Sequence, residues 1–243
     1  MLDDLTTLDP LAWDALKKAL NQRVVVGRIR LLPSRRNRVW VVETDVRPIV
    51  VKRFLSGRCG HEFETLLQAK LAGLDVPYPL WSDGTHLVTE YIVGESCELM
   101  VNHMFSSAAA EAMGTWLARF HARLGEGNMV KIMADAVLSN FLFAQDRVYG
   151  VDFEDSRMGD PLDDVGQLAA NMLGSEPFFT PVKFDLCLQM IRSYGRASGM
   201  DVVEKARPHV ARHLKLDARN KPLFRRTLVS AAKSLERGWP KLA

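Results

Sequence analysis

The stretch that decides the fold is Asp135-Ala-Val-Leu-Ser-Asn140, with Asp152-Phe-Glu-Asp155 beginning twelve residues after Asn140. Between them lie a short apolar run, a polar turn at Gln145-Asp-Arg147 and a second apolar run. This pattern predicts two short strands that form a hairpin, with a carboxylate delivered at each end.

Phosphoryl transfer uses oxygen-bearing side chains on two such loops. In that reaction one Asp orients the acceptor hydroxyl, while an Asn and a second Asp hold Mg²⁺ against the phosphates. Asp135 is therefore the candidate for orienting the acceptor, and Asn140 and Asp152 are the candidate metal ligands.

Length and composition indicate an ordinary globular protein. The 243 residues suit one large domain or two small lobes, and 47% of them are apolar and 25% charged. The net charge of +3 is too small to indicate nucleic acid. The segment 201–243 carries eleven Lys and Arg against four Asp and Glu. It indicates either an anionic partner or, more ordinarily, a solvated helical face.

The cysteines and the apolar runs bear on location. Cys59, Cys97 and Cys187 are odd in number and far apart, so they predict neither a disulfide framework nor a zinc site. The acidic N-terminal residues do not resemble a signal peptide. No uncharged apolar run approaches the roughly 18 residues of a membrane span. We therefore expect a cytoplasmic protein without a membrane span.

The N-terminal part of the chain predicts a small sheet with one helix. A helix start at Asp9-Pro10 predicts a lead-in helix outside the main fold. Three β-rich segments then predict an antiparallel meander, and two more strands follow the next helix. The strand segments begin at Val24, Arg38, Pro48, Leu80 and His86. The break at Gly94-Glu-Ser96 predicts three parts: the lead-in helix 1–22, an N-lobe 23–93 and a C-lobe 94–243.

Within the N-lobe, Lys52 lies in the third strand, where it can project toward a ligand. The segment His61–Ala72 predicts a helix with one apolar face. That face comprises Phe63, Leu66, Leu67 and Leu71. Glu62 and Glu64 flank it on opposite sides, so periodicity does not choose between them as a partner for Lys52.

The C-lobe reads as helical apart from the central hairpin. A strong amphipathic helix is predicted over 108–124, in which His121 is interpreted as a buried structural residue that ties the helix to the loop. Further helices are predicted from Leu162 and from Pro181, and Pro208 and Pro222 are expected to punctuate two or so more.

The order of these elements is more specific than any one of them. Three strands with Lys52 precede a helix with Glu62, two more strands, a break and a long helix. Asp135, Asn140 and Asp152 follow in that order.

In this order the sequence resembles the aminoglycoside phosphotransferase and choline kinase branch of the protein-kinase-like fold, from about Val24 on. Asp152-Phe-Glu-Asp155 followed by Gly159-Asp-Pro161 is similar to that family's metal-loop motif. Gly73-Leu-Asp-Val-Pro77 and Leu117-Ala-Arg-Phe-His121 match two further segments. The resemblance implies a two-lobed α+β fold, with a small antiparallel β-rich N-lobe containing one helix and a larger, mostly helical C-lobe.

The resemblance also implies roles for the candidate residues. Lys52 would contact the α- and β-phosphates of ATP, and the spacing back from Gly73 favours Glu62 over Glu64 as its partner. Asp135 would orient and deprotonate the acceptor hydroxyl.

The remaining roles concern the metal, the adenine and the catalytic loop. Asn140 and Asp152 would hold Mg²⁺, a hard ion that suits these ligands. Glu90 and Ile92 lie in the connection that would bind adenine through backbone groups. Asp164 matches the family's helix Asp, which braces the catalytic loop.

Two departures from the family pattern stand out. Met133 and Ala134 replace the usual His and Gly before the catalytic Asp, and the added Cβ costs little unless φ must be positive. The turn 31–37 lacks glycine. There Arg35 and Arg36 either meet phosphate as cations or are solvated turn residues.

The leading interpretation is an ATP-dependent kinase of a hydroxylated small molecule or an envelope sugar. An atypical protein kinase of the RIO or lipopolysaccharide-kinase type, and a catalytically weak pseudokinase scaffold, are the alternatives. Glu154, Asp155 and Asp160 either present negative charge to a cationic acceptor or, as the favoured interpretation, brace their loops.

Overall fold

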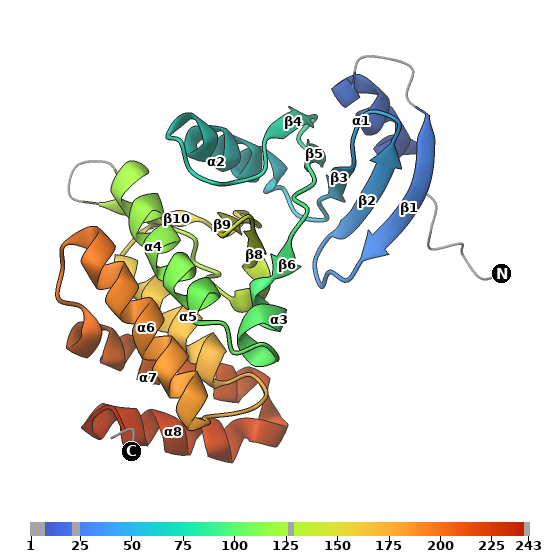
Figure 1. Ribbon diagram of the computed structural model, residues 1–243. Coiled ribbons are helices and arrows are strands. Elements are labelled where there is room, and N and C mark those ends of the chain that lie inside the picture. The colour runs from blue at the N-terminus through green and yellow to red at the C-terminus, as the bar shows by residue number, and fades with distance from the viewer. Residues whose placement is uncertain (1–7, 21–24, 126–128, 241–243) are drawn as a thin grey trace. The chain divides into compact units, whose positions relative to one another are not determined.

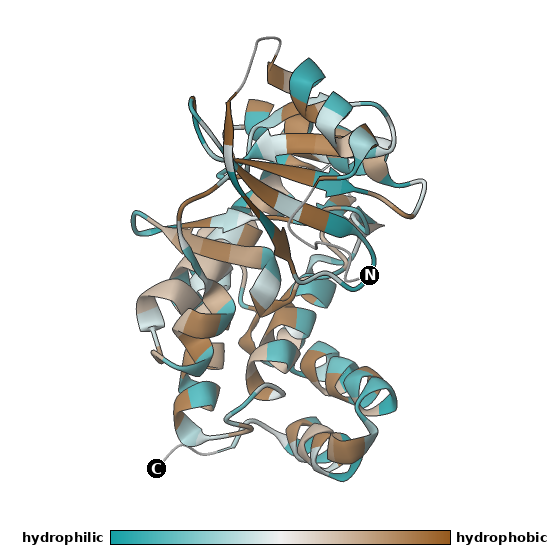
Figure 2. Ribbon diagram, turned by 90° about the vertical axis from the view of Figure 1, so that its right-hand side faces the viewer, coloured by the Kyte–Doolittle hydropathy of each residue, from teal (hydrophilic) through white to brown (hydrophobic). Residues whose placement is uncertain are grey.

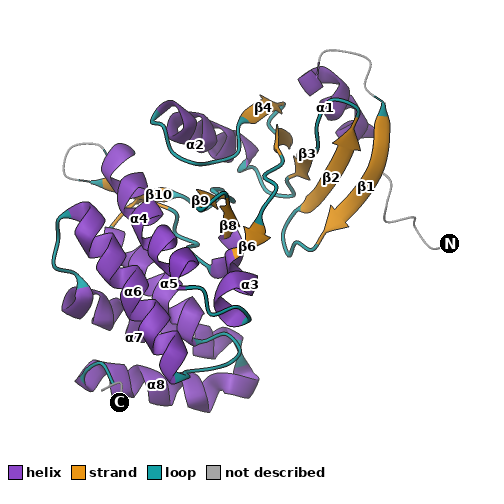
Figure 3. Cartoon of the chain, in the orientation of Figure 1, coloured by secondary structure: helices purple, strands orange, loops and turns teal. Residues whose placement is uncertain are grey.

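The computed structural model describes residues 8–20, 25–125 and 129–240. The expected boundary at 22/23 and the start of the first strand at Val24 lie outside these residues. The chain forms two compact units (Figures 1 and 3). Unit 1 comprises Met1–Leu71, Val76–Val93 and Asp152–Asp155, and unit 2 comprises Ala72–Asp75, Gly94–Val151 and Ser156–Ala243.

Unit 1 is built on a five-stranded antiparallel sheet in the order β1-β2-β3-β5-β4. Its β-branched and aromatic residues favour the pleated, half-buried strands that Figure 2 shows mainly in brown. The strands are β1 (Val26–Leu32), β2 (Arg38–Thr44), β3 (Ile49–Arg53), β4 (Pro79–Ser82) and β5 (His86–Glu90).

Helix α1 (Pro10–Leu20) packs on one face of this sheet. It starts as predicted, because Asp9 Oδ1 accepts a hydrogen bond of 2.9 Å from the Ala12 amide. It is not outside the main fold, however. Its buried side chains join the sheet in one hydrophobic cluster: Ala12, Ala15 and Leu16 with Trp40, Val42, Ile49, Val51 and Val88.

This packing decides where Lys52 points. Side chains alternate between the two faces of a strand, so Ile49 and Val51 face α1 while Lys52 faces the opposite side. There it meets Glu62 from helix α2 (Cys59–Leu71).

The predicted apolar face of α2 needs a correction. Leu71 is 80% exposed, and the buried face is instead Cys59, Glu62, Thr65, Leu66 and Ala69. Periodicity of apolar residues missed this face because it includes a buried carboxylate and a hydroxyl.

Unit 2 is mainly helical, as predicted. Its helices are α3 (Cys97–Asn102), α4 (Ser107–Arg123), α5 (Pro161–Leu173), α6 (Pro181–Ser198), α7 (Val203–Asn220) and α8 (Arg225–Arg237). A Cβ on Gly114 of α4 would lie 2.1 Å from the Met190 carbonyl oxygen of α6, so glycine permits this close helix contact. Pro208 lies inside α7, which corrects the expectation that it separates helices.

Short strands border the two polar loops of unit 2. The predicted hairpin is β8 (Phe141–Ala144) with β9 (Arg147–Gly150), and β6 (Glu95–Ser96) adds to β8. A second ladder pairs β7 (Val130–Ile132) with β10 (Arg157–Gly159). These last strands were not predicted, because three residues are too few for an alternating pattern.

The basic C-terminal segment is part of the core of unit 2. Leu214 of α7 and Leu228 and Leu235 of α8 are buried. Several of its cations pair with acids, including Lys215 with Glu236. A solvated helical face is therefore the better explanation of this segment than an anionic partner. No helix in the described residues is long and apolar enough to cross a membrane.

Candidate active site

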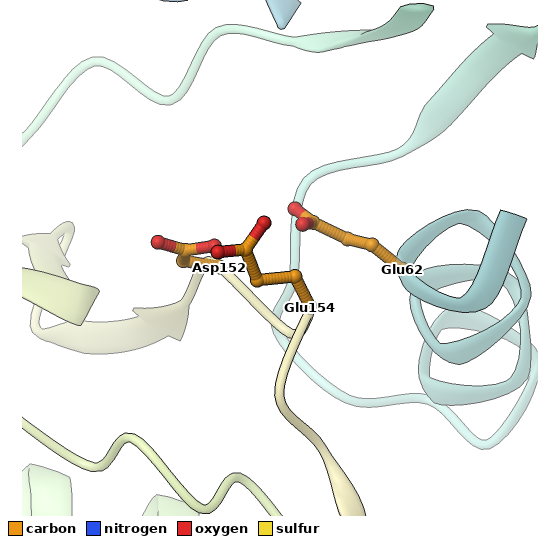
Figure 4. A group of neighbouring side chains, drawn as sticks. All are labelled: Glu62, Asp152 and Glu154. Atoms are coloured by element: carbon orange, nitrogen blue, oxygen red, sulfur yellow. The ribbon is translucent and has the colours of Figure 1, made fainter. Parts of the chain in front are cut away.

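Lys52 is the centre of a buried charge cluster in unit 1. Its Nζ lies 2.7 Å from Glu62 Oε2, 2.6 Å from Asp152 Oδ1 and 4.0 Å from Glu154 Oε2. Figure 4 shows the three carboxylates directed toward one another, Glu62 from α2 and the other two from the loop 152–155, named the metal loop for its expected role. One oxygen from each lies within 4.8 Å of the others. Glu64 is exposed, so Glu62 is the residue that contacts Lys52.

The contacts within this cluster and its burial shift the pKa values of Lys52 and Glu62. Burial acts to lower the pKa of Lys52, but the Glu62 and Asp152 carboxylates outweigh it, and the net pKa is raised. Burial raises the pKa of Glu62 to about 7, and Lys52 opposes this shift only in part. Lys52 is therefore held as an ammonium, while Glu62 exchanges its proton near neutral pH.

The metal loop is braced by its own acidic residues. Glu154 Oε2 accepts a hydrogen bond of 2.8 Å from Asn37 Nδ2. Asp155 pairs with Arg36 at 2.6 Å and also with Arg58. In unit 2, Asp160 Oδ1 caps α5 by accepting from the Leu162 amide at 2.9 Å. All three acids bind protein groups, as expected for braces.

The backbone at Asp152 is also special. Its φ is +63°, in the left-handed region that Asp and Asn tolerate better than most residues. This turn directs one carboxylate oxygen to Lys52 while the side chain stays 39% exposed.

In unit 2, the loop 133–140, named the catalytic loop for its expected role, runs from the end of β7 to the start of β8. Ile132 pairs with Arg157 at one end, and Phe141 pairs with Gly150 at the other. The Val151 amide donates to the Asn140 carbonyl oxygen at 3.0 Å, immediately before Asp152 in the chain. The two ladders thus fix both ends of the loop 133–140 within unit 2.

Helix α5 holds the first half of this loop through Asp164. The Asp164 carboxylate is fully buried and accepts from the amides of Met133 at 2.6 Å and Ala134 at 2.9 Å. Its Oδ2 also lies 3.1 Å from His121 Nε2, whose ring Nδ1 lies 3.0 Å from Tyr194 Oη. His121 is therefore a buried residue that ties α4 to the loop through Asp164, as interpreted from the sequence.

The sequence interpretation missed two further residues of α5. Gln167 Oε1 accepts from the Ala136 amide at 3.0 Å, and Asn171 Oδ1 accepts from the Leu138 amide at 2.9 Å. With Asp164 they occupy positions three and seven residues apart, which share one helix face. That polar stripe on an otherwise apolar helix was the signal that could have identified them.

Asp135 and Asn140 lie together in the loop. Asn140 Nδ2 donates to the Asp135 carbonyl oxygen at 2.9 Å and to its Oδ2 at 3.3 Å, and Gln167 Nε2 lies 3.4 Å from Asp135 Oδ1. The Asp135 carboxylate is thus oriented by two neutral amide donors.

Met133 and Ala134, the two residues before Asp135, depart from the family pattern in sequence. Met133 is fully buried. Ala134 has φ +60°, the conformation in which a Cβ is unfavourable. The sequence departure therefore adds backbone strain at Ala134 without removing the hydrogen bonds that the Met133 and Ala134 amides donate to Asp164.

The expected adenine connection begins where β5 ends. The Glu90 amide donates to the Tyr78 carbonyl oxygen at 3.0 Å, and Glu90 Oε2 accepts from the Tyr78 amide at 3.1 Å. Ile92 lies two residues beyond the end of the strand. Tyr78 and Glu90 thus fix the start of this connection within unit 1.

The side chains present fit a hard divalent cation. Asp152 uses Oδ1 for Lys52, and Asn140 uses only its amide nitrogen in its side-chain hydrogen bonds to described residues. A carboxylate oxygen and an amide oxygen therefore remain, which are ligands that Mg²⁺ prefers. Asp152 belongs to unit 1 and Asn140 to unit 2.

Comparison with solved structures decides the fold. The streptomycin–ATP–APH(2'')-IIa ternary complex matches with a TM-score of 0.61 and 15% identity, over 94% of this chain and 99% of that one. The amicoumacin kinase hAmiN, in complex with AMP-PNP, Ca²⁺ and Ami, matches with a TM-score of 0.66 and 12% identity, over 95% and 87%. The chain has the aminoglycoside phosphotransferase fold.

This fold extends to the choline kinase branch. A choline/ethanolamine kinase family protein from Mesorhizobium loti matches with a TM-score of 0.59 and 16% identity, over 86% of this chain and 88% of that one. No family model and no curated protein sequence matches. The predicted two-lobed, kinase-like α+β fold is confirmed, and Lys52, Glu62 and Asp152 lie in one unit of this chain.

Proposed function

We propose that the protein is an ATP-dependent phosphotransferase that moves the γ-phosphoryl group of Mg-ATP to a hydroxyl of a small molecule or envelope sugar. The observation that carries this proposal is the contact of Lys52 with both Glu62 and Asp152. Phosphoryl transfer needs a lysine fixed near a metal-binding carboxylate, so that both meet the same phosphates.

In unit 1, Lys52 would bind the α- and β-phosphates, and Glu62 would hold the Lys52 ammonium in place. The connection that includes Glu90 and Ile92 would bind adenine through backbone groups. We propose residues 23–93 as the nucleotide-binding N-lobe, 94–243 as the C-lobe that carries the catalytic loop and acceptor site, and 1–22 as the lead-in part.

The metal requirement follows from the charge of the cluster around Lys52. The carboxylates of Glu62, Asp152, Glu154 and Asp155 contact Lys52, Arg36 and Arg58 and offset their positive charge. The cluster therefore has little positive charge left to offset a polyphosphate unless a divalent cation enters with it. Asp152 and Asn140 would hold Mg²⁺, which neutralises phosphate charge during transfer.

In unit 2, Asp135 would orient the acceptor hydroxyl and take its proton. Its carboxylate is positioned by the amide groups of Asn140 and Gln167. The loop amides of Met133 and Ala134 are fixed by Asp164, so the loop is held before any acceptor arrives.

The acceptor class is proposed from the solved structures of this fold. Two of them hold streptomycin or Ami together with ATP or AMP-PNP. We propose a hydroxylated small molecule here as well. A cytoplasmic location is part of the proposal, because Cys59, Cys97 and Cys187 are all buried free thiols.

Phosphate transfer from labelled Mg-ATP to a panel of hydroxylated acceptors tests the proposal. The panel should include aminocyclitols, amino alcohols and hexoses, with wild type, Asp135→Asn and the control Asp146→Asn, which lies in the exposed β8–β9 turn. We expect an acceptor, or slow ATP hydrolysis without one, that Asp135→Asn abolishes and Asp146→Asn retains. Nucleotide binding with no turnover in any protein would favour the pseudokinase alternative.

A further inference from the structure

Two arginines beside the Lys52 cluster share one carboxylate. Arg36 lies in the turn between β1 and β2, and Arg58 directly precedes α2. Arg36 Nη1 is 2.6 Å from Asp155 Oδ2 and 3.5 Å from Glu154 Oε1. Arg58 Nη1 contacts Asp155 Oδ1 and lies 3.5 Å from the Glu154 carbonyl oxygen. All four residues belong to unit 1.

The guanidinium of Arg36 remains accessible in this arrangement. Its side chain is 66% exposed, whereas Asp155 is 21% exposed and Glu154 is 6% exposed. An arginine carries five N–H donors, and these contacts use only Nη1 of Arg36. Arg36 can therefore meet a second anion from the solvent side.

Asn37, at the end of the turn that carries Arg36, holds this turn in place. Asn37 is 8% exposed, donates to Glu154 at 2.8 Å through Nδ2, and accepts from the Leu55 amide at 3.3 Å through Oδ1. Its own amide donates to Ser34 Oγ at 3.2 Å. These bonds hold the turn against the metal loop independently of Arg36, so the arginine can exchange partners without releasing the turn.

The chemistry of the turn favours side-chain recognition of phosphate. Residues 31–37 lack glycine, so each carries a side chain that hinders close wrapping of the backbone around a ligand. A guanidinium binds phosphate oxygens in bidentate fashion and with charge assistance. Asp155 is a weaker competitor than a polyphosphate, because it already shares its charge with Arg58.

We propose that Arg36 binds a phosphate of the nucleotide, and that Asp155 holds Arg36 in the nucleotide-free protein until that phosphate displaces it. Arg58 keeps the Asp155 carboxylate in place after the exchange. The inference rests on the proposed phosphotransferase function. The Arg36 guanidinium would make the phosphate contact that backbone amides make in a glycine-rich loop.

Calorimetric titration of Mg-ADP and of adenosine into five proteins tests the exchange. They are wild type, Arg36→Gln, Asp155→Asn, the double variant, and Arg35→Gln as a matched control. Arg35 is exposed and adjacent to Arg36, and removing it changes the net charge equally. Thermal melting of each protein checks that the fold is kept.

Arg36→Gln should weaken Mg-ADP about tenfold and leave adenosine unchanged, while Arg35→Gln should change neither by more than about twofold. Asp155→Asn should tighten Mg-ADP about threefold or more, because the closer of the two carboxylates that contact Arg36 then no longer competes for it, and the double variant should match Arg36→Gln. Equal losses in the two arginine variants, or weaker Mg-ADP binding by Asp155→Asn, would overturn the inference. No nucleotide binding by wild type would overturn the proposed function itself.

Discussion

The Asp164 carboxylate holds Ala134 in a left-handed backbone conformation. Asp164 Oδ1 accepts a hydrogen bond of 2.9 Å from the Ala134 amide, and Ala134 has φ +60°. The contact with Asp164 therefore imposes on an alanine a backbone conformation that suits glycine. Ile132, two residues earlier in the chain, is fully buried. Helix α5 therefore holds the first half of the loop, and the bond from Asn140 to Asp135 holds the loop from within.

Replacing Ala134 with glycine should stabilise the protein. Glycine adopts positive φ without the Cβ penalty, so we expect a gain of about 0.5–1 kcal/mol in the free energy of unfolding. Urea denaturation measures it. Ala136→Gly is the matched control, because Ala136 is buried and its φ is not positive. That control should lose about 1 kcal/mol, and a loss in both variants would refute the strain at Ala134.

Asp164→Asn should destabilise the protein and loosen the catalytic loop. An asparagine offers one acceptor oxygen where two loop amides and His121 now meet a buried carboxylate, so we expect a loss of about 2–4 kcal/mol. The neighbouring Asp163→Asn changes only contacts to partly exposed side chains such as Arg212 and should cost less than about 1 kcal/mol. Similar losses in the two variants would contradict the brace.

Gln167→Glu should separate loop support from the environment of Asp135. The new side chain can still accept from the Ala136 amide, but it places a carboxylate where Nε2 now lies 3.4 Å from Asp135 Oδ1. Like charge disfavours the ionised form of Asp135, so the acidic limb of the pH–rate profile for ATP hydrolysis should move up by roughly one pH unit. An unshifted limb with reduced rates at every pH would instead indicate a general structural defect.

The sequence predicted the order of elements, the hairpin and the pairing of Lys52 with Glu62 because each depends on local pattern or on family motifs. It did not predict that Glu62 lies on the buried face of α2, since apolar periodicity takes no account of a buried carboxylate. It also left the role of Arg36 open. Its contact with Asp155 joins residues 119 positions apart, and no local pattern encodes such a contact.

The loop contacts of α5 were also predicted only in part, because they too join residues far apart in the sequence. Asp164 was identified from a motif, whereas Gln167 and Asn171 were not, although all three hold loop amides. Their spacing places them on one helix face, but the sequence does not say which loop that face meets. Tertiary packing supplies that information.

Glu62 should make stability depend on pH below neutrality. Folding raises its pKa from 4.5 to about 7, so between these values the folded protein binds more protons than the unfolded chain. Stability from this group is therefore present at low pH and is lost as pH rises toward 7. The stability of wild type relative to Glu62→Gln should fall by on the order of 2 kcal/mol between pH 5 and pH 8.

Chemical denaturation at several pH values measures this difference. Glu64→Gln, on the exposed side of the same helix, is the control and should run parallel to wild type at every pH. A constant offset between wild type and Glu62→Gln would show that Glu62 does not titrate in this range.

The most direct test of the account is calorimetric titration of ATP into wild type and Asp152→Asn, with saturating Mg²⁺ and with a chelator. Asparagine suits the φ of +63° at this position, so the variant removes the charge and not the turn. We predict that Mg²⁺ strengthens ATP binding by wild type at least tenfold and has no such effect on Asp152→Asn. No binding by wild type, or the same Mg²⁺ dependence in both proteins, would contradict the account.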